Sequence, residues 1–303
     1  MILNLFETAQ RHARLLLVAG LLAGLTLPAL AAVIKDALPG LVALLLCLSA
    51  VRVGAKATLG NLKDLHGTAG ALLILQLVLP LAALGAVLVL GLEDQPLAFA
   101  LLLMLSAPSI TGAQNFTSLM GHNPAPPMRL LILGTAVFPA SALIALWGLP
   151  GLEGSGGAAL AALRLAIVIA AGVGLGFALR RIFLPAPSTA QTRALDGASA
   201  ILLAIMVVGL MAALGPALRA NPSEVAIWLV VASAANFGLQ VAAHRLGAGP
   251  GTSIVAGNRN IALYLVALPA SVTDPLLIFI GCYQIPMYLT PVVMQRFYGR
   301  TAA

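Results

Sequence analysis

The sequence predicts an all-α polytopic membrane protein built from ten transmembrane helices. Of its 303 residues, 61% are hydrophobic and only 8% are charged, whereas a soluble domain carries about 25% charged residues. The apolar runs approach or exceed the ~20 residues that span a bilayer as a helix. They lack the period-two alternation of a β-barrel. Because backbone groups in hydrocarbon must be bonded internally, helices are the remaining solution.

Ten apolar segments are predicted to cross the membrane. The second is short, and the fourth and the ninth are interrupted by polar residues. In chain order the segments are Leu15–Ile34, Leu38–Val53, Thr68–Leu90, Leu97–Met120, Met128–Leu149, Ala158–Leu179, Ala194–Leu214, Val225–His244, Thr252–Pro269 and Leu276–Tyr298.

The first segment has an alternative interpretation as a signal peptide. Arg11 and Arg14 precede it, and Ala29 to Ala31 has the form of a cleavage site. The apolar run is long for a signal core, and the internal repeat described below requires this helix. We therefore expect a retained transmembrane segment.

The basic residues gather on one side of this topology. Twelve of the sixteen lysines and arginines fall at the two termini and in the even-numbered loops, three fall on the other side, and Arg259 lies inside a segment. Because cytoplasmic loops are enriched in Lys and Arg, both termini are predicted to be cytoplasmic and the protein to reside in the inner (plasma) membrane. The net charge of +7 is thereby explained without a nucleic acid partner.

Two similar motifs relate the halves of the chain. Gly112 to Asn115 and Gly257 to Asn260 both read glycine, any residue, a long polar donor, asparagine. Their offset of 145 residues also superposes the first apolar segment on the sixth. The pattern predicts a single membrane domain with two five-helix repeats, 1–150 and 158–303. Since five is odd, the second repeat would be inverted, as in transporters whose sites lie near the midplane at discontinuous helices.

Both motifs lie where a helix is predicted to break. Pro108 removes a backbone donor and clashes with the preceding turn, and glycine tolerates non-helical dihedrals. The resumed half-helices are expected to begin near Gln114 and Arg259, with N-terminal amides suited to an anion. The alternative is a pair of kinks whose amides join neighbouring helices.

Arg259 is the one charged residue that the prediction does not assign to a loop or a segment end. A charge at the bilayer centre costs ~2.5–3.5 kcal/mol on insertion scales and is normally functional. The alternative is an arginine that snorkels to the interface. Every acidic residue lies at a segment end or in a loop. Additional polar candidates within or beside the segments are Asn236, Gln240, Gln284, Tyr288 and His122.

At these motifs the chain resembles the bile acid:sodium symporter family. The resemblance rests on Pro108, Thr111 and Asn115, on the Gly-His-Asn-Pro loop that follows, on Gly257 to Asn260 with the next Ile-Ala-Leu, and on Gln76 before Pro80. The family implies two inverted five-helix repeats in which helices four and nine are broken and cross. It also implies a core of helices three to five and eight to ten that moves against a panel of helices one, two, six and seven.

The resemblance implies alternating-access transport of a small organic anion, with Na⁺ as the usual coupling ion. Val255 and Arg259 stand where the family has Glu and Gln ligands for Na⁺, and Leu131 replaces a serine ligand. We therefore expect altered Na⁺ sites, no bound metal and no other cofactor. We hypothesise that the Arg259 guanidinium takes the place of a sodium ion. The residues expected to bind substrate or ion are Gln76, Thr111, Gln114, Asn115, Thr135, Asn258, Arg259 and Asn260.

Other functional classes are less consistent with the residues. An enzyme would need a Ser/His, paired-Asp or metal constellation within the segments, and we expect none. A cation/proton antiporter would need midplane carboxylates. A non-transporting receptor or sensor on the same fold stays open. The expected partners are the lipid bilayer and the anion, while substrate identity, transport direction, coupling ion and oligomeric state are left undetermined.

Overall fold

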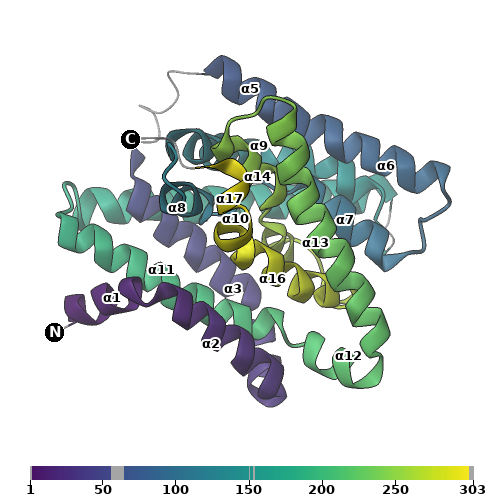
Figure 1. The fold of residues 1–303 in the computed structure, drawn as a ribbon, viewed down its shortest axis with the longest axis horizontal. Helices are drawn as coiled ribbons and strands as arrows, with labels where there is room; N and C mark the ends of the chain where they lie inside the picture. The colour runs from purple at the N-terminus through teal and green to yellow at the C-terminus, as the bar shows by residue number, and fades with distance from the viewer. Residues whose placement is uncertain (1, 56–64, 150, 153, 300–303) are drawn as a thin grey trace. The chain divides into compact units, whose positions relative to one another are not determined.

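The computed structural model describes residues 2–55, 65–149, 151–152 and 154–299, and these residues are almost entirely helical (Figure 1). The described residues contain an isolated β-bridge and no strand. The chain forms two compact units. Unit 1 comprises Met1–Leu59 and Ile167–Pro222, and unit 2 comprises Gly60–Ala166 and Ser223–Ala303. The boundary between them falls once within a long helix, α10 (Gly154–Phe183).

Among the described residues, seven helical segments are long and apolar enough to cross a membrane, so the chain has the character of a multi-pass membrane protein. Ten crossings were predicted, and the other three are not confirmed because the helices in those segments are too short to be counted among the seven. The first predicted segment is a helix of only 14 residues, and the fourth and ninth are interrupted. The seven are Pro28–Val53, His66–Val89, Ala125–Trp147, Gly156–Phe183, Thr189–Ala220, Pro222–Arg245 and Ala270–Val293.

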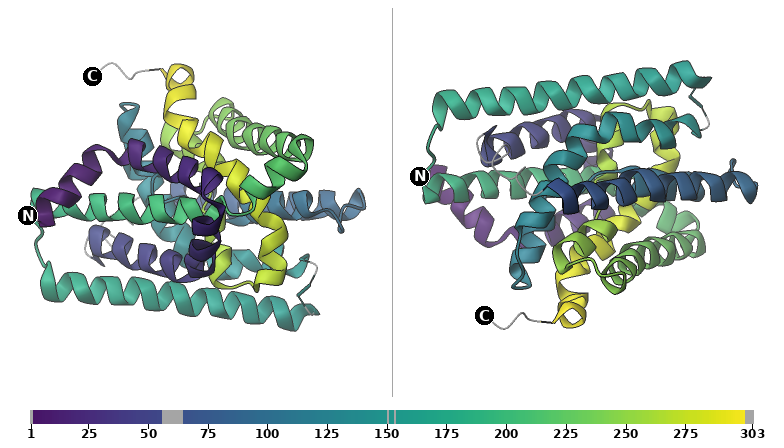
Figure 2. Two further views of the ribbon diagram at one scale, coloured as in Figure 1. Left: turned by 90° about the horizontal axis from the view of Figure 1, so that it is seen from below. Right: turned by 90° about the horizontal axis from the view of Figure 1, so that it is seen from above.

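Unit 1 is organised around α11 (Thr189–Leu210). Three helices pack on α11 (Figure 2), namely α1 (Ile2–Arg11), α2 (Ala13–Thr26) and α3 (Pro28–Val53). Glycines make these contacts close: a Cβ on Gly20 of α2 would lie 2.5 Å from the carbonyl oxygen of Ala204 on α11. A short helix, α12 (Leu214–Ala220), follows α11.

The break between the first two predicted segments lies at Leu27, so the expected loop at residues 35–37 is wrong. Leu27 is non-helical, with φ −116° and ψ 72°, and Pro28 opens the next helix. Proline disfavours the helical conformation in the preceding residue and is well accommodated at a helix start. Lys35 and Asp36 therefore lie within α3, where their polarity alone does not end the helix.

Unit 2 holds most of the remaining helices, and several of them are short or irregular. The helix that begins at Leu65 is interrupted by a π-helical turn, η2, and two others give way to extended chain. Their bounds are α5 (Leu65–Leu73), η2 (Ile74–Val78), α6 (Leu79–Val89), α7 (Pro96–Ser106), α8 (Ala113–Leu119), α9 (Ala125–Trp147), α13 (Pro222–Arg245), α14 (Pro250–Gly257), the 3₁₀ helix η3 (Ile261–Val266), α15 (Ala270–Thr273), the 3₁₀ turn η4 (Asp274–Leu276), α16 (Leu277–Val293) and α17 (Gln295–Tyr298).

The predicted interruptions of the fourth and ninth segments are confirmed by the helix bounds. α7 ends because Ala107 precedes Pro108 and is extended, with φ −66° and ψ 151°. α14 ends at Gly257, and Asn258 is extended, with φ −115° and ψ 93°. The chain resumes as an α-helix at Ala113 after the first interruption and as a 3₁₀ helix at Ile261 after the second, so the half-helix expected near Arg259 is present in a tighter form.

The two Gly-x-polar-Asn motifs do not occupy equivalent places at these interruptions. Gly112 follows the first interruption and precedes α8, whereas Gly257 ends α14 before the second. The β-bridge pairs Ser109 with Arg259, 150 residues further along. The offset of 145 residues therefore does not align the interruptions, and the inverted repeat itself remains a prediction.

Candidate functional site

The two interrupted segments lie antiparallel to each other in unit 2. Ser109 and Arg259 form the β-bridge. The backbone N–H of Ile110 donates to the carbonyl of Asn258 over 3.2 Å, and that of Asn260 donates to the carbonyl of Pro108 over 2.8 Å. Each extended segment thus satisfies backbone groups that the other has freed, which is a requirement for non-helical chain at membrane depth.

The Arg259 side chain is enclosed at this junction. It is only 1% exposed, and its guanidinium donates to three backbone carbonyls. Nη2 lies 2.9 Å from Leu75 O, Nη1 lies 2.9 Å from Ala107 O, and Nε lies 3.1 Å from Ala256 O. The alternative of a snorkelling arginine is therefore wrong, because the guanidinium points into the protein.

The Leu75 carbonyl is free because of the π-helical turn. The N–H of Leu79 bonds to Ile74 O rather than to Leu75 O, which is the i→i−5 pattern of a π-helix. In that pattern the next donor would be residue 80, and Pro80 has no N–H. Leu75 O therefore lacks a partner within its helix and accepts from Arg259.

The other two carbonyls are freed by the ends of α7 and α14. Ala107 is the last residue before Pro108, and the chain beyond it is no longer helical. Ala256 would normally accept from the N–H of Asn260, which instead donates to Pro108 O. Three separate helix irregularities thus each leave a carbonyl oxygen without a helical donor, and the Arg259 guanidinium donates to all three.

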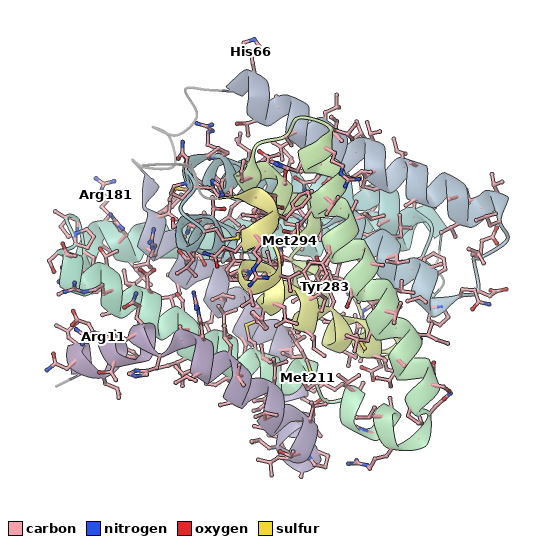
Figure 3. All side chains as sticks on the ribbon, in the orientation of Figure 1. Arg11, His66, Arg181, Met211, Tyr283 and Met294 are labelled. Atoms are coloured by element: carbon pink, nitrogen blue, oxygen red, sulfur yellow. The ribbon has the colours of Figure 1, made fainter. Side chains whose placement is uncertain are left out.

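Tyr283 of α16 completes the second interruption. Its hydroxyl accepts from the backbone N–H of Arg259 over 2.9 Å and donates to the carbonyl of Gly257. Figure 3 shows Tyr283 on α16 within unit 2, whereas Arg11 and Arg181 extend from helix ends of unit 1. The tyrosine therefore bonds two backbone groups that the end of α14 leaves without helical partners.

A network of buried neutral polar side chains continues from this point. The Asn236 amide donates to Gly257 O and to Asn258 Oδ1, and the Gln240 amide donates to Asn236 Oδ1 over 2.8 Å. Thr290 lies 3.2 Å from both Asn258 Oδ1 and the Gln240 amide nitrogen, and the Tyr298 hydroxyl donates to Gln240 over 3.1 Å. The network joins α13, α16 and α17 to the interruption after α14.

Gly257 is needed because α13 approaches it closely. A Cβ at this position would collide with the carbonyl oxygen of Asn236 and lie 2.6 Å from Gln240 Cγ. Only glycine lets the end of α14 come near enough for the Asn236 amide to reach the Gly257 carbonyl.

The predicted site residues divide into two groups. Asn258 and Arg259 are buried and spend their side-chain hydrogen bonds inside unit 2. The second group makes no side-chain hydrogen bond within the described residues, and it ranges from buried Gln114 to exposed Asn115. Its members are Thr111, Gln114, Asn115, Thr135 and Asn260. The first group bonds to the interruption, and the polar groups of the second have no hydrogen-bond partner among the described residues.

Gln76 belongs partly to each group. Its amide nitrogen donates to Gly134 O over 3.1 Å, next in sequence to Thr135, and it lies beside Leu75 in the π-helical turn. Its Oε1 atom is buried and has no hydrogen-bond donor among the described residues. A buried carbonyl oxygen without a donor is costly, so Gln76 retains an unused acceptor.

Sequence reasoning missed Tyr283 and Thr290 and selected Gln284 and Tyr288 from the same helix. The Gln284 amide donates to Ile280 O of its own helix, and the Tyr288 hydroxyl makes no hydrogen bond in the described part of the chain. Tyr283 and Thr290 are seven residues apart and so share one helix face. This spacing of two polar side chains on one helix face was the sequence signal that could have identified them. The candidate His122 lies with its ring centroid 6.3 Å from that of Tyr298, beside the end of the network.

Comparison with known proteins adds no family assignment. No protein-family model matches the sequence, and no curated protein matches it. The geometry of unit 2 is therefore the basis for any functional conclusion.

Proposed function

We propose that this chain is a secondary-active or facilitative transporter of a small organic anion, working by alternating access and similar to bile acid:sodium symporters. The observation that carries the proposal is the pair of antiparallel helix interruptions held together by a buried arginine. Discontinuous helices at the membrane interior are the hallmark of transporter binding sites. A buried cation near unbonded polar side chains favours an anionic ligand.

The charges support a carrier over a cation/proton antiporter. Arg259 is the one charged side chain that is buried among the residues described, and no described carboxylate is buried. A proton relay or a cation pathway would use buried Asp or Glu. The long apolar helices support a lipid bilayer as the surroundings, and we propose the inner (plasma) membrane with both termini cytoplasmic.

Uptake into proteoliposomes tests the proposal directly. The full chain is reconstituted, and uptake of radiolabelled small carboxylates and sulfonates is measured with an inward Na⁺ gradient and with N-methylglucamine replacing Na⁺. We expect saturable uptake of at least one anion that does not depend on the Na⁺ gradient, because Val255 and Arg259 replace the family's Na⁺ ligands. Strong dependence on the gradient would contradict the altered Na⁺ sites.

Two groups of variants locate the site. Asn115→Ala and Asn260→Ala remove side chains that make no hydrogen bond within the described residues, so they should raise the KM for uptake while the melting temperature changes little. Asn4→Ala, on an exposed position of α1 in unit 1, is the matched control and should leave both unchanged. If all three variants raised the KM for uptake equally, the anion site would not lie at these interruptions.

Ligand binding without flux is the result that would favour a receptor or sensor instead. Thermal-shift measurements on detergent-solubilised protein therefore accompany the uptake assay with the same anions. An anion that stabilises the protein but is neither taken up nor exchanged by proteoliposomes would contradict the proposed transport. It would still support an anion-binding site.

A further inference from the structure

An open apolar groove runs between α13 and the helices α6 and α7 of unit 2 (Figure 1). Its volume of about 500 Å³ lies within the range of about 300–1,000 Å³ that is usual for ligand sites. The wall on α13 is formed by Ala234, Gly238 and Ala242, which recur every four residues and are all exposed. A Cβ added to Gly238 would meet no atom within 4 Å. Small side chains such as Ala86 and Ala98 line the opposite wall, so an apolar chain can enter the groove from outside.

A positive charge lies just beyond one end of this groove, on the same face of α13. Arg245 follows Ala242 by three residues and Ala234 by eleven, which is close to three full helical turns. Its side chain is exposed and forms no hydrogen bond or ion pair within the described residues. At 1.5 Å per residue, the distance along α13 from Ala234 to Arg245 is about 17 Å. The acyl chains of one leaflet occupy a similar length, half of a hydrocarbon core about 30 Å thick.

The combination of an apolar groove and a cation at its end fits an amphiphile with an anionic headgroup. Arginines near the membrane surface attract anionic lipids by about 1 kcal/mol each. A second copy of the chain fits less well, because symmetric docking of two α13 helices in one membrane would bring a second Arg245 to the same side. Charge complementarity therefore favours a lipid over a second copy.

We propose that this groove binds one acyl chain of an anionic phospholipid, whose phosphate pairs with Arg245. The residues that line the groove do not include the extended segments around Ser109 and Arg259. The lipid site is therefore separate from the proposed transport site and requires no transport activity.

Melting of the full chain in a neutral detergent tests the proposal. All proteins carry Cys47→Ala, so that unfolding is followed by reaction of a thiol dye with Cys282, which is buried in α16. Dioleoylphosphatidylglycerol at about ten times its Kd should raise the melting temperature by roughly 3–6 °C, by mass action. Dioleoylphosphatidylcholine has the same chains without the net charge and should raise it less. Glycerol 3-phosphate has the anionic group without chains and should leave it unchanged. An equal effect of the two lipids, or of glycerol 3-phosphate, would contradict the proposal.

Two variants and their matched controls locate the site. Gly238→Leu fills the groove and should abolish the response to both lipids, whereas Arg245→Gln should remove only the preference for phosphatidylglycerol. Gly70→Leu changes an open glycine of α5 outside the groove, and Arg219→Gln changes an exposed arginine of α12. Both controls should respond as the wild type does. A full response of Gly238→Leu, or an unchanged lipid preference of Arg245→Gln, would overturn the proposal.

Native mass spectrometry of the wild type keeps the test decisive if Gly238→Leu does not fold. After incubation with equal amounts of the two lipids, the protein should retain one phosphatidylglycerol in preference to phosphatidylcholine. Retention without preference, or a lipid-free dimer, would contradict the assignment, and the dimer would assign the groove to a second copy. Asn115→Ala, which tests the proposed transport site, should keep the full lipid response, so failure of either proposal can be distinguished from failure of the other.

Discussion

Units 1 and 2 use their polar residues in different ways. In unit 1 they secure helix ends: Arg52 lies 2.8 Å from an Asp196 oxygen with both side chains 27% exposed, and Arg180 donates to the carbonyls of Val51 and Arg52 at the end of α3. In unit 2 the arginine at 259 is buried and bonds to carbonyls inside the helix interruptions. The comparison teaches that arginines bond to carbonyls without helical donors in both units, but in unit 1 they do so at a helix end with partly exposed side chains, whereas in unit 2 a buried guanidinium does so inside the interruptions.

The two buried cysteines allow the units to be compared within one protein. Cys47 lies in α3 of unit 1, Cys282 lies in α16 of unit 2, and both thiols are free. Replacing one cysteine by alanine leaves a thiol that reacts with a dye only when its own unit opens. The effect of each substitution below on the opening of unit 1 and of unit 2 can therefore be measured separately, through Cys47 and through Cys282.

The largest effect is expected for Gly257→Ala in unit 2. The added Cβ would meet the carbonyl oxygen of Asn236 on α13, and backbone atoms cannot rotate away. We expect a loss of about 3 kcal/mol or more, at the upper end for overpacked sites, seen as early reaction of Cys282 on heating. Gly238→Ala, on an open face of α13, is the control and should be neutral or slightly stabilising. Similar melting of the two variants would contradict close packing at Gly257.

A smaller effect is expected for Tyr283→Phe. The change removes the acceptor of the Arg259 N–H and one donor to Gly257 O, leaving a buried N–H unpaired at a cost of about 1–3 kcal/mol. Cys282 should react at a temperature lower by several degrees, while Cys47 should be unaffected. Tyr288→Phe on the same helix is the matched control. A change in Cys47 reactivity as large as that of Cys282 would show that the effect is not confined to unit 2.

The difference between local and long-range interactions explains how much of the fold and of the candidate site could be predicted from the sequence. Pro108 and Gly257 indicate interruptions because their backbone chemistry is local, and both interruptions were placed within a few residues. The π-helical turn at Gln76 was not predicted, because it depends on Pro80 together with a guanidinium 184 residues from Leu75 in the chain. Local rules predict where a helix fails, and only the tertiary fold determines which group satisfies the freed carbonyl.

The error at Leu27 has the same origin. Lys35 and Asp36 suggested a loop by polarity, but a helix tolerates exposed charges, and the dihedral restriction before Pro28 decides the position of the break. For the site, Arg259 was predicted from its cost in a membrane. Tyr283 was not, since a tyrosine in an apolar helix gives no comparable signal until its neighbours are known.

The polar network should show an intermediate effect. Thr290→Val keeps the side-chain shape but removes the hydroxyl that contacts Gln240 and Asn258, so we expect a loss of about 1–2 kcal/mol. Thr26→Val in unit 1 removes an exposed hydroxyl that bonds to Leu22 O and should cost less than about 0.5 kcal/mol. Thr290→Ser should recover most of the loss. If Thr290→Val and Thr26→Val were equally stable, the network would not contribute to folding of unit 2.

The smallest effect is expected for Arg52→Ala. The Arg52–Asp196 pair is partly exposed, and such pairs contribute about 0–1 kcal/mol because water and salt screen them. Reaction of Cys47 should begin only slightly earlier than in the wild type, and the difference should shrink as NaCl rises from about 0.05 M to about 1 M, where the Debye length falls to about 3 Å. Arg259→Gln measured through Cys282 should lose more stability and should change little with salt, since its partners are buried. A salt-independent loss in Arg52→Ala equal to that of Arg259→Gln would remove the distinction between arginines that secure helix ends and one that substitutes for helical bonds.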